Sequence, residues 1–202
     1  MELAVITSEG LFDGESDVLN DLFDTGLMRL HLRKPKVSAA QMFNILRQIR
    51  PEFYGRIIIH NHVELCATFG LKGVHLSLEV LLENGKPKNC GEISCSAHTI
   101  AEATVCGNMV NRVFISPLFD SISKKGYAGN AELLTTPKPK TDAIWVALGG
   151  ITPERLPIVH QHGFEAAALM GYIWKGKNPQ QQFEVCQKAV AGLKKKGEPG
   201  GR

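Results

Sequence analysis

The stretch IWVALGGITPERL, residues 144–156, decides the fold of this chain. It begins with an apolar segment, residues 144–148, that predicts a buried strand and runs directly into Gly149 and Gly150. The threonine and proline at 152–153 then predict the N-cap and first position of a helix. A strand that ends in glycine before a helix lets the backbone approach a ligand closely.

The same pattern recurs at once in GFEAAALMG, residues 163–171, where a second apolar strand, residues 166–170, ends at Gly171. Two consecutive strands that end in glycine are typical of a phosphate site at the mouth of a parallel barrel. There, backbone N–H groups and a helix N-terminus bind the anion without needing a lysine.

Composition limits the class of protein. A chain of 202 residues that is 44% hydrophobic predicts one domain, residues 1–196, with a flexible tail at 197–202. A net charge of +3, with scattered basic residues, argues against nucleic-acid binding. No apolar run predicts a membrane span, and no signal pattern opens the chain. Five cysteines without a CxxC pair predict reduced thiols, so we expect a cytoplasmic protein.

Eight short apolar runs, most of them followed by a helical pattern, predict an α/β protein, specifically a compact TIM (β/α)8 barrel. An open doubly wound sheet is the alternative, but it has no natural place for eight similar strands. The predicted strands are 3–7, 28–33, 56–60, 73–76, 93–96, 112–115, 144–148 and 166–170. The predicted helices are 16–25, 38–49, 63–69, 98–106, 153–162 and 180–194, with two degenerate ones at 78–83 and 131–135.

Polar residues gather where the predicted strands end, which is where a barrel enzyme places its active site. Arg33 lies two residues beyond His31, on the same face of its strand. Its guanidinium suits phosphate oxygens, although a structural ion pair at the barrel mouth is the alternative. The other polar residues at these ends are His60, Asn61, His62, His75, Glu79, Ser96 and His98.

The loop SPLFDSISKKGYAGN, residues 116–130, follows the sixth strand. Ser121 and Ser123 alternate, so in extended chain their hydroxyls point the same way, and Lys124 follows. Two hydroxyl donors beside an ammonium suit a phosphate or diphosphate. A solvated surface loop is the alternative, but its place beside the glycine-ended strands favours the anion site.

With these residues located, the chain resembles the thiamine-phosphate synthase/TenI family over nearly its whole length. No single motif is unique, but the ordered set is specific. The segments that carry the resemblance are HLRKP (31–35), IIIHNH (57–62), GVHL (73–76), ISCSAHTIAEA (93–103), SPLFDSISKKG (116–126), VALGGI (146–151) and the strand at 163–171.

The resemblance implies a barrel that takes two small-molecule partners, a phosphorylated thiazole and a pyrimidine diphosphate, with Mg²⁺ as cofactor. It implies no nucleic acid and no membrane, and it leaves a homo-oligomer open. By the same resemblance, the residues that grip the thiazole phosphate are Ser121, Ser123, Gly149, Gly150 and Gly171. Those that match the diphosphate-binding and catalytic groups are Arg33, Asn61, Ser96 and Lys124.

The chain departs from the synthase pattern at its metal site. The pattern has Asp where this chain has His62, and a second Asp where it has Val80. Mg²⁺ prefers oxygen ligands, and a neutral imidazole replaces a carboxylate poorly. His62 and Glu79 are therefore the remaining metal-ligand candidates.

Two further departures lie near the second strand. The synthase pattern has Gln in place of His31 and Lys in place of Pro35. Lys34 or Lys36 is the candidate for the displaced ammonium.

The departures leave several functions open. The first is transfer of the pyrimidine group onto thiazole phosphate. A TenI-like thiazole tautomerase needs no metal, but Pro117 stands where that branch has its histidine, so His31, His62 or His75 would have to act as acid and base. A non-catalytic binder of thiazole phosphate and a metal hydrolase using His60 and His62 with His75 are the other readings.

Overall fold

The computed structural model describes residues 1–122, 126 and 128–196. Eight parallel strands form a closed barrel in sequential order, and β1 closes it by pairing with both β2 and β8. This confirms the (β/α)8 prediction and rules out an open sheet. The strands are β1 (Glu2–Ile6), β2 (Leu30–Leu32), β3 (Ile57–Ile59), β4 (Gly73–Leu76), β5 (Glu92–Ala97), β6 (Arg112–Ile115), β7 (Ile144–Ala147) and β8 (Ala166–Leu169).

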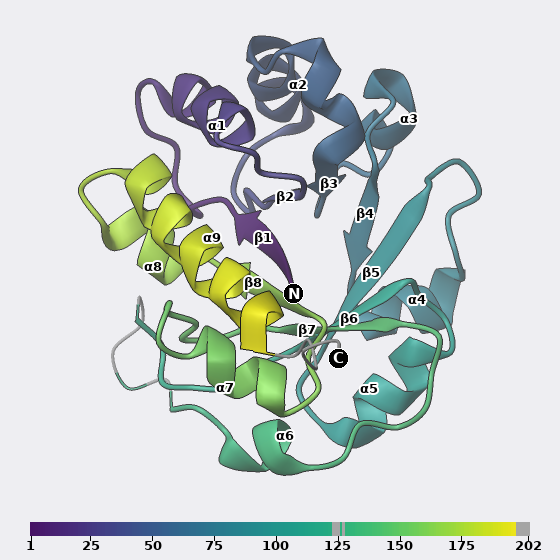
Figure 1. Ribbon diagram of the computed structural model, residues 1–202. Helices are drawn as coiled ribbons and strands as arrows, with labels where there is room; N and C mark the ends of the chain where they lie inside the picture. Colours follow the sequence, from purple (N-terminus) through teal and green to yellow (C-terminus); the bar gives the residue numbers. More distant parts are fainter. Residues whose placement is uncertain (123–125, 127, 197–202) are drawn as a thin grey trace, which may run out of the picture.

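Helices surround the strands, as Figure 1 shows. All eight predicted helices are present, within a few residues of their expected ends. Two short elements were not expected, the 3-10 helix η1 and the helix α8. The helices are α1 (Glu15–Asp24), α2 (Ala39–Gln48), η1 (Pro51–Arg56), α3 (Leu65–Phe69), α4 (Leu78–Asn84), α5 (Ile100–Gly107), α6 (Ala131–Thr135), α7 (Leu156–Gln161), α8 (Gly171–Lys175) and α9 (Pro179–Lys196).

The apolar core has two parts. The larger part lies between the strands and the helices. The smaller part fills one side of the barrel interior, where Phe114 packs among small side chains such as Ala4, Ala166 and Ala168. Small residues on β1 and β8 leave room for the phenylalanine on β6, because an eight-stranded barrel is just wide enough for side chains to fill it.

Charged side chains close the end of the barrel where the strands begin. Arg29 lies 2.8 Å from Glu92, and Arg112 lies 3.1 Å from Glu92 and 2.6 Å from Glu2. The side chains of Arg29, Arg112 and Glu92 are at most 13% exposed. Their charges are stable there because each has an opposite charge within contact distance.

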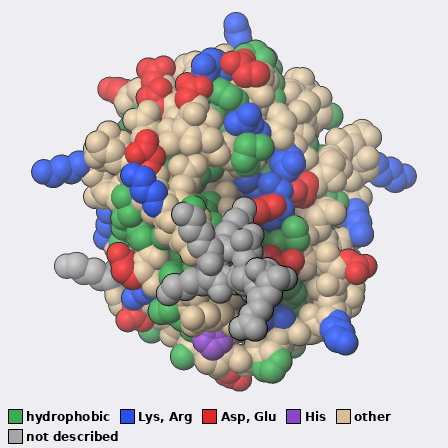
Figure 2. All heavy atoms as spheres, viewed as in Figure 1, with side chains coloured by type: hydrophobic (Ala, Val, Ile, Leu, Met, Phe, Trp, Pro, Cys, Tyr) green, Lys and Arg blue, Asp and Glu red, His purple; other side chains and the backbone are tan. Residues whose placement is uncertain are grey.

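The surface shows no concentration of one charge on the face drawn in Figure 2, where Lys and Arg side chains alternate with Asp and Glu. Among the described residues, no helix is both long enough and apolar enough to cross a membrane. All five cysteines are free thiols, as their number and spacing predicted.

Glu92→Gln tests the charged layer. It removes the carboxylate that both buried arginines share, and we expect the free energy of unfolding to fall by about 3 kcal/mol. Glu2→Gln is the matched control. The Glu2 carboxylate is 56% exposed, and without it Arg112 still pairs with Glu92. The free energy of unfolding should therefore fall by less than about 1 kcal/mol. Urea denaturation of both variants measures the difference, and equal losses would contradict this assignment.

Candidate phosphate-binding site

A cavity of about 660 Å³ opens at the end of the barrel where the strands finish. Ile6, Leu76, Phe114 and Met170 give it apolar walls. Polar groups from the loops after several strands also reach it, which is the arrangement expected of a small-molecule site. Seven of the residues predicted from the sequence line this cavity: Arg33, Asn61, Ser96, Ser121, Gly149, Gly150 and Gly171. Ser123 and Lys124 lie outside the described residues.

The glycine end of β7 is held against the loop that follows β6. The backbone N–H of Leu118 donates to the carbonyl of Leu148 at 3.0 Å, and that of Phe119 donates to the carbonyl of Gly149 at 3.2 Å. A Cβ on Gly149 would lie 2.8 Å from Pro117 Cα, so only glycine permits this approach.

Gly150 is constrained in two ways. Its φ of 65° lies in the left-handed region, and a Cβ there would lie 2.4 Å from the carbonyl oxygen of Asp120. Its own carbonyl accepts a hydrogen bond from Arg155 Nη1 at 2.5 Å, and the Arg155 guanidinium lies over the Phe119 ring. These contacts fix the turn that the sequence predicted.

The helix after this turn begins later than predicted. We expected it to start at Pro153 with Thr152 as N-cap, but α7 begins at Leu156. The carbonyl of Thr152 accepts from the N–H groups of both Arg155 and Leu156, so a separate turn precedes the helix. The sequence predicted a helix in this segment correctly, but it did not predict the residue at which the helix begins.

Arg33 is positioned by β1. The Thr7 hydroxyl accepts from the Arg33 N–H and donates to the Arg33 carbonyl, both at 3.0 Å. At the cavity, Arg33 Nη1 lies 2.6 Å from a carboxylate oxygen of Glu9, and both side chains are about two-fifths exposed. An exposed pair of this kind is weak, so the guanidinium can exchange Glu9 for an anion in the cavity.

Asn61 is oriented by the backbone of the second strand's loop. Its Nδ2 donates to the carbonyl of Lys34 at 2.9 Å. The second N–H of Nδ2 is then the donor left for an anionic ligand in the cavity, and the amide oxygen is left to accept.

Ser96 bonds to a histidine inside the barrel. Its hydroxyl lies 2.9 Å from His75 Nε2, while His75 Nδ1 lies 2.9 Å from the Ser94 hydroxyl. Ser94 donates its own proton to the carbonyl of Val74, so its oxygen accepts from His75 Nδ1–H. His75 Nε2 therefore carries a lone pair that faces Ser96 at the cavity wall.

Three histidines form one cluster at the inner end of the cavity, where His60 and His75 line its wall. His31 Nδ1 lies 3.0 Å from His60 Nε2, and the rings of His60 and His75 stack with centroids 4.2 Å apart. Burial lowers the pKa of His31 and of His60 well below the usual value, and burial together with the charge of Arg33 lowers the pKa of His75 to about 3. All three imidazoles are therefore neutral near pH 7.

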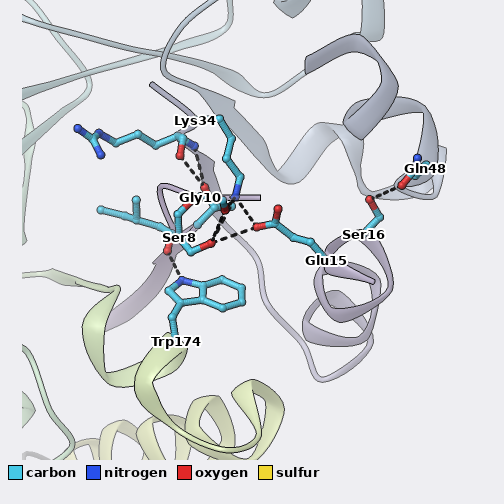
Figure 3. A network of polar contacts seen from close by, with 10 residues as sticks. Ser8, Gly10, Glu15, Ser16, Lys34, Gln48 and Trp174 are labelled. Carbon is cyan, nitrogen blue, oxygen red and sulfur yellow. Dashed lines mark hydrogen bonds and ion pairs between the residues drawn. The ribbon is translucent and has the colours of Figure 1, made fainter. Parts of the chain in front are cut away.

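Lys34 does not reach the cavity. Its ammonium is fully buried beside Glu15 Oε1, at 2.5 Å, and it donates to the carbonyls of Ser8 and Gly10, as Figure 3 shows. Lys34 joins the segment after β2 to the segment after β1 and to α1, and its ion pair with Glu15 is structural. Lys36 is exposed and also lies outside the cavity lining, so neither lysine stands in for the ammonium of the family pattern.

The two metal-ligand candidates do not meet. His62 has a left-handed backbone, with φ of 57°, and its Nε2 contacts the carbonyl of Val37 at 2.9 Å. Glu79 is exposed on α4, and neither residue lines the cavity. Among the described lining residues, Glu9 is the only carboxylate, and it pairs with Arg33. These residues do not fit a carboxylate Mg²⁺ site.

Glu9 is the cavity residue that sequence reasoning missed. It lies three residues beyond the end of β1, in the segment ITSEG. The signal is its place after the first strand, because polar residues at the ends of barrel strands form the site.

The family comparison agrees with this geometry. A model of the family described as "Thiamine monophosphate synthase" matches residues 3–173, most of the chain. The chain belongs to this family. A thiamine-phosphate synthase of Lawsonia intracellularis is 23% identical, over 94% of this chain and 92% of that protein. One from Haloarcula marismortui is 21% identical, over 94% and 96% respectively.

Solved structures of the same family share the fold. Thiamine phosphate pyrophosphorylase from Bacteroides thetaiotaomicron is 27% identical, with a TM-score of 0.73 over 95% of this chain and 98% of that one. The enzyme from Pyrococcus furiosus, at 18% identity, has a TM-score of 0.76 over 95% and 96% respectively. At these identities the family and its place in thiamine biosynthesis are clear, while the reaction of this chain needs its own argument.

Gly150→Ala tests the close approach at the end of β7. The new methyl group meets the Asp120 carbonyl, so we expect a larger loss of unfolding free energy than in Gly163→Ala. Gly163 also has a positive φ, 80°, but has no atom within 4 Å of a Cβ. The difference between the variants, about 1–3 kcal/mol, isolates the steric term. Thermal denaturation measures it, and equal melting temperatures would rule out the contact.

Lys34→Ala tests the structural role of the buried lysine. It leaves the Glu15 carboxylate buried without its cation, so the free energy of unfolding should fall by about 3–5 kcal/mol. Lys36→Ala, two residues away and exposed, should change it by less than about 0.5 kcal/mol. If both variants unfold like the native chain, Lys34 is not the structural cation described above.

Proposed function

We propose that this chain catalyses the synthase reaction of its family, the transfer of a hydroxymethylpyrimidine group from its diphosphate to thiazole phosphate. The observation that carries the proposal is one cavity that gathers the glycine ends of β7 and β8, Ser121 and Arg33. Backbone N–H groups at glycine turns suit the single phosphate of the thiazole, and an arginine across the cavity suits a second, more highly charged group.

The transfer reaction requires stabilisation of developing charge more than it requires proton transfer. The bond between the pyrimidine methylene carbon and the diphosphate oxygen breaks, and the diphosphate leaves with the electron pair. The thiazole nitrogen then gives its lone pair to the methylene carbon to form the new C–N bond. Arg33, together with Lys124 as a proposed partner, would stabilise the negative charge that develops on the diphosphate.

The apolar walls suit the cationic side of this reaction. Ile6, Phe114 and Met170 line the cavity and would exclude water from an electron-deficient carbon. The face of an aromatic ring also attracts a cation. Ser96 and Asn61 are proposed to orient phosphate oxygens at the opposite wall, where the Ser96 hydroxyl would exchange its bond to His75 for one to the ligand.

A second candidate is thiazole tautomerisation, which requires proton transfer and no diphosphate. The observation in its favour is that two neutral imidazoles, those of His60 and His75, line the same cavity. A neutral imidazole with an accessible lone pair can act as a general base. Binding of thiazole phosphate with no turnover would indicate the third reading, a ligand-binding protein.

The test is formation of thiamine phosphate from the two substrates at saturation, with and without Mg²⁺, followed by mass spectrometry. We expect product from the native chain and a loss in kcat/KM of about a hundredfold for Arg33→Met, since a group that stabilises developing charge contributes on that scale. Arg47→Met, an exposed arginine on α2, is the control and should keep native activity. No product from the native chain would reject the transfer, and a tautomerase assay on His60→Gln would then decide the second candidate.

A further inference from the structure

At the inner end of the cavity, β2, the end of β3 and β4 each place one histidine in the same cluster. His31 belongs to β2, His60 follows β3 directly and His75 belongs to β4. One ring nitrogen from each lies within 4.8 Å of the other two. The strands are neighbours in the barrel, and His31 pairs in register with Ile58, so the closeness follows from the sheet itself.

We propose that His31, His60 and His75 form a binding site for a divalent transition-metal ion, Zn²⁺ in particular, with a fourth coordination position open to the cavity. Three imidazoles and one exchangeable position are the ligand set of many zinc sites that act on substrates. The proposal does not depend on the synthase reaction, because it rests on residues that the family resemblance does not assign to a metal.

The ligand chemistry favours a late transition metal over Mg²⁺. Neutral imidazole nitrogen suits zinc, copper, iron and nickel, whereas Mg²⁺ takes oxygen ligands. Two nitrogens on a tetrahedral zinc ion lie about 3.3 Å apart at the usual bond lengths. The 3.0 Å between His31 Nδ1 and His60 Nε2 is close to that separation, and the ligand nitrogens of all three rings lie within 4.8 Å of one another. The proton that joins His31 Nδ1 and His60 Nε2 has to move to the far nitrogen of its ring when an ion binds.

His75 already has its tautomer fixed for this role. Its Nδ1–H donates to the Ser94 hydroxyl, which leaves the Nε2 lone pair directed at Ser96. An ion would replace only the Ser96 proton at this nitrogen. A ligating histidine usually donates a hydrogen bond from its far nitrogen to a fixed acceptor, which holds the ring in orientation.

His31 also carries a buried polar atom that has no partner. His31 is fully buried, and its Nε2 has no hydrogen-bond partner among the described residues. A polar group in this state costs about 1–3 kcal/mol, so a chain that only needed to fill the barrel would do better with an apolar residue.

The surrounding charges also permit a cation. Arg29 and Arg112 lie toward the floor of the barrel below His31, and Arg33 lies toward the mouth near His75. Each arginine pairs with a carboxylate, from Glu92, Glu2 or Glu9, so the net field at the cluster is much weaker than three free cations would give.

The structure also explains why His62 does not join His60 and His75, as one alternative from the sequence had it. The HxH spacing of His60 and His62 favours a shared face only if the strand continues through both residues. β3 ends at Ile59, and the left-handed backbone at His62 turns that side chain toward Val37. His31 from the neighbouring strand takes the place that His62 was expected to fill.

The experiment is calorimetric titration of the chelator-treated full chain with ZnCl₂, in a large excess of Mg²⁺. We expect one Zn²⁺ per chain, and a visible absorption spectrum of a tetrahedral nitrogen-ligated ion when Co²⁺ replaces Zn²⁺. Loss of the hydrogen-bond partner of a metal ligand weakens binding by about 10- to 100-fold. His60→Gln and His75→Gln each remove a ligand and should weaken Zn²⁺ binding by more than this. Ser94→Ala, which removes such a partner, should fall within that range.

His98→Gln is the matched control, since His98 also lines the cavity but bonds to the carbonyl of Ser116 and lies outside the cluster. It should bind Zn²⁺ like the native chain. Circular dichroism checks that each variant is folded, and His60 faces the open cavity, so its replacement is the least disruptive. Absence of Zn²⁺ binding to the native chain, or equal affinities for His60→Gln and His98→Gln, would overturn the proposal. Neither result would affect thiazole-phosphate binding, which the glycine turns supply.

Discussion

Two backbone hydrogen bonds, from Leu118 to Leu148 and from Phe119 to Gly149, hold the loop after β6 against the end of β7. They continue the strand pairing beyond the barrel, and they exist only because no side chain stands between the two segments. Barrel closure then places the end of β8, with Gly171, beside the same turn. The candidate phosphate site therefore depends on backbone packed against backbone, and a single methyl group at 149 or 150 is enough to disturb it.

The interior of the barrel has three layers along its axis, and they differ in the kind of polar group that they contain. The floor carries charges that are neutralised by Glu92 and Glu2. The middle holds the neutral histidines, whose pKa values burial has lowered, beside the aromatic ring of Phe114. The top is the open cavity. A polar core of this kind adds little stability compared with an apolar one.

The sequence predicted the features that local pattern controls. Apolar runs separated by helical patterns identified eight strands in a closed barrel, and the strand-end rule found Arg33, Asn61 and Ser96 at the cavity. It could not predict where a chain turns after a strand ends. The alternative reading that paired His60 with His62 fails for this reason, because the left-handed backbone at His62 turns its side chain toward Val37. The pairing of Lys34 with Glu15 could not be predicted from the sequence either, because the two residues belong to different segments and meet only in the folded chain.

The central claim is that the glycine-lined end of the barrel recognises a phosphate group on a small ligand. The most direct measurement compares the affinities of thiazole phosphate and of the same thiazole alcohol without its phosphate, by calorimetry on the native chain. Several hydrogen bonds to a charged group should make the phosphorylated ligand bind at least about a hundredfold more tightly. Equal affinities for the two ligands would contradict the account.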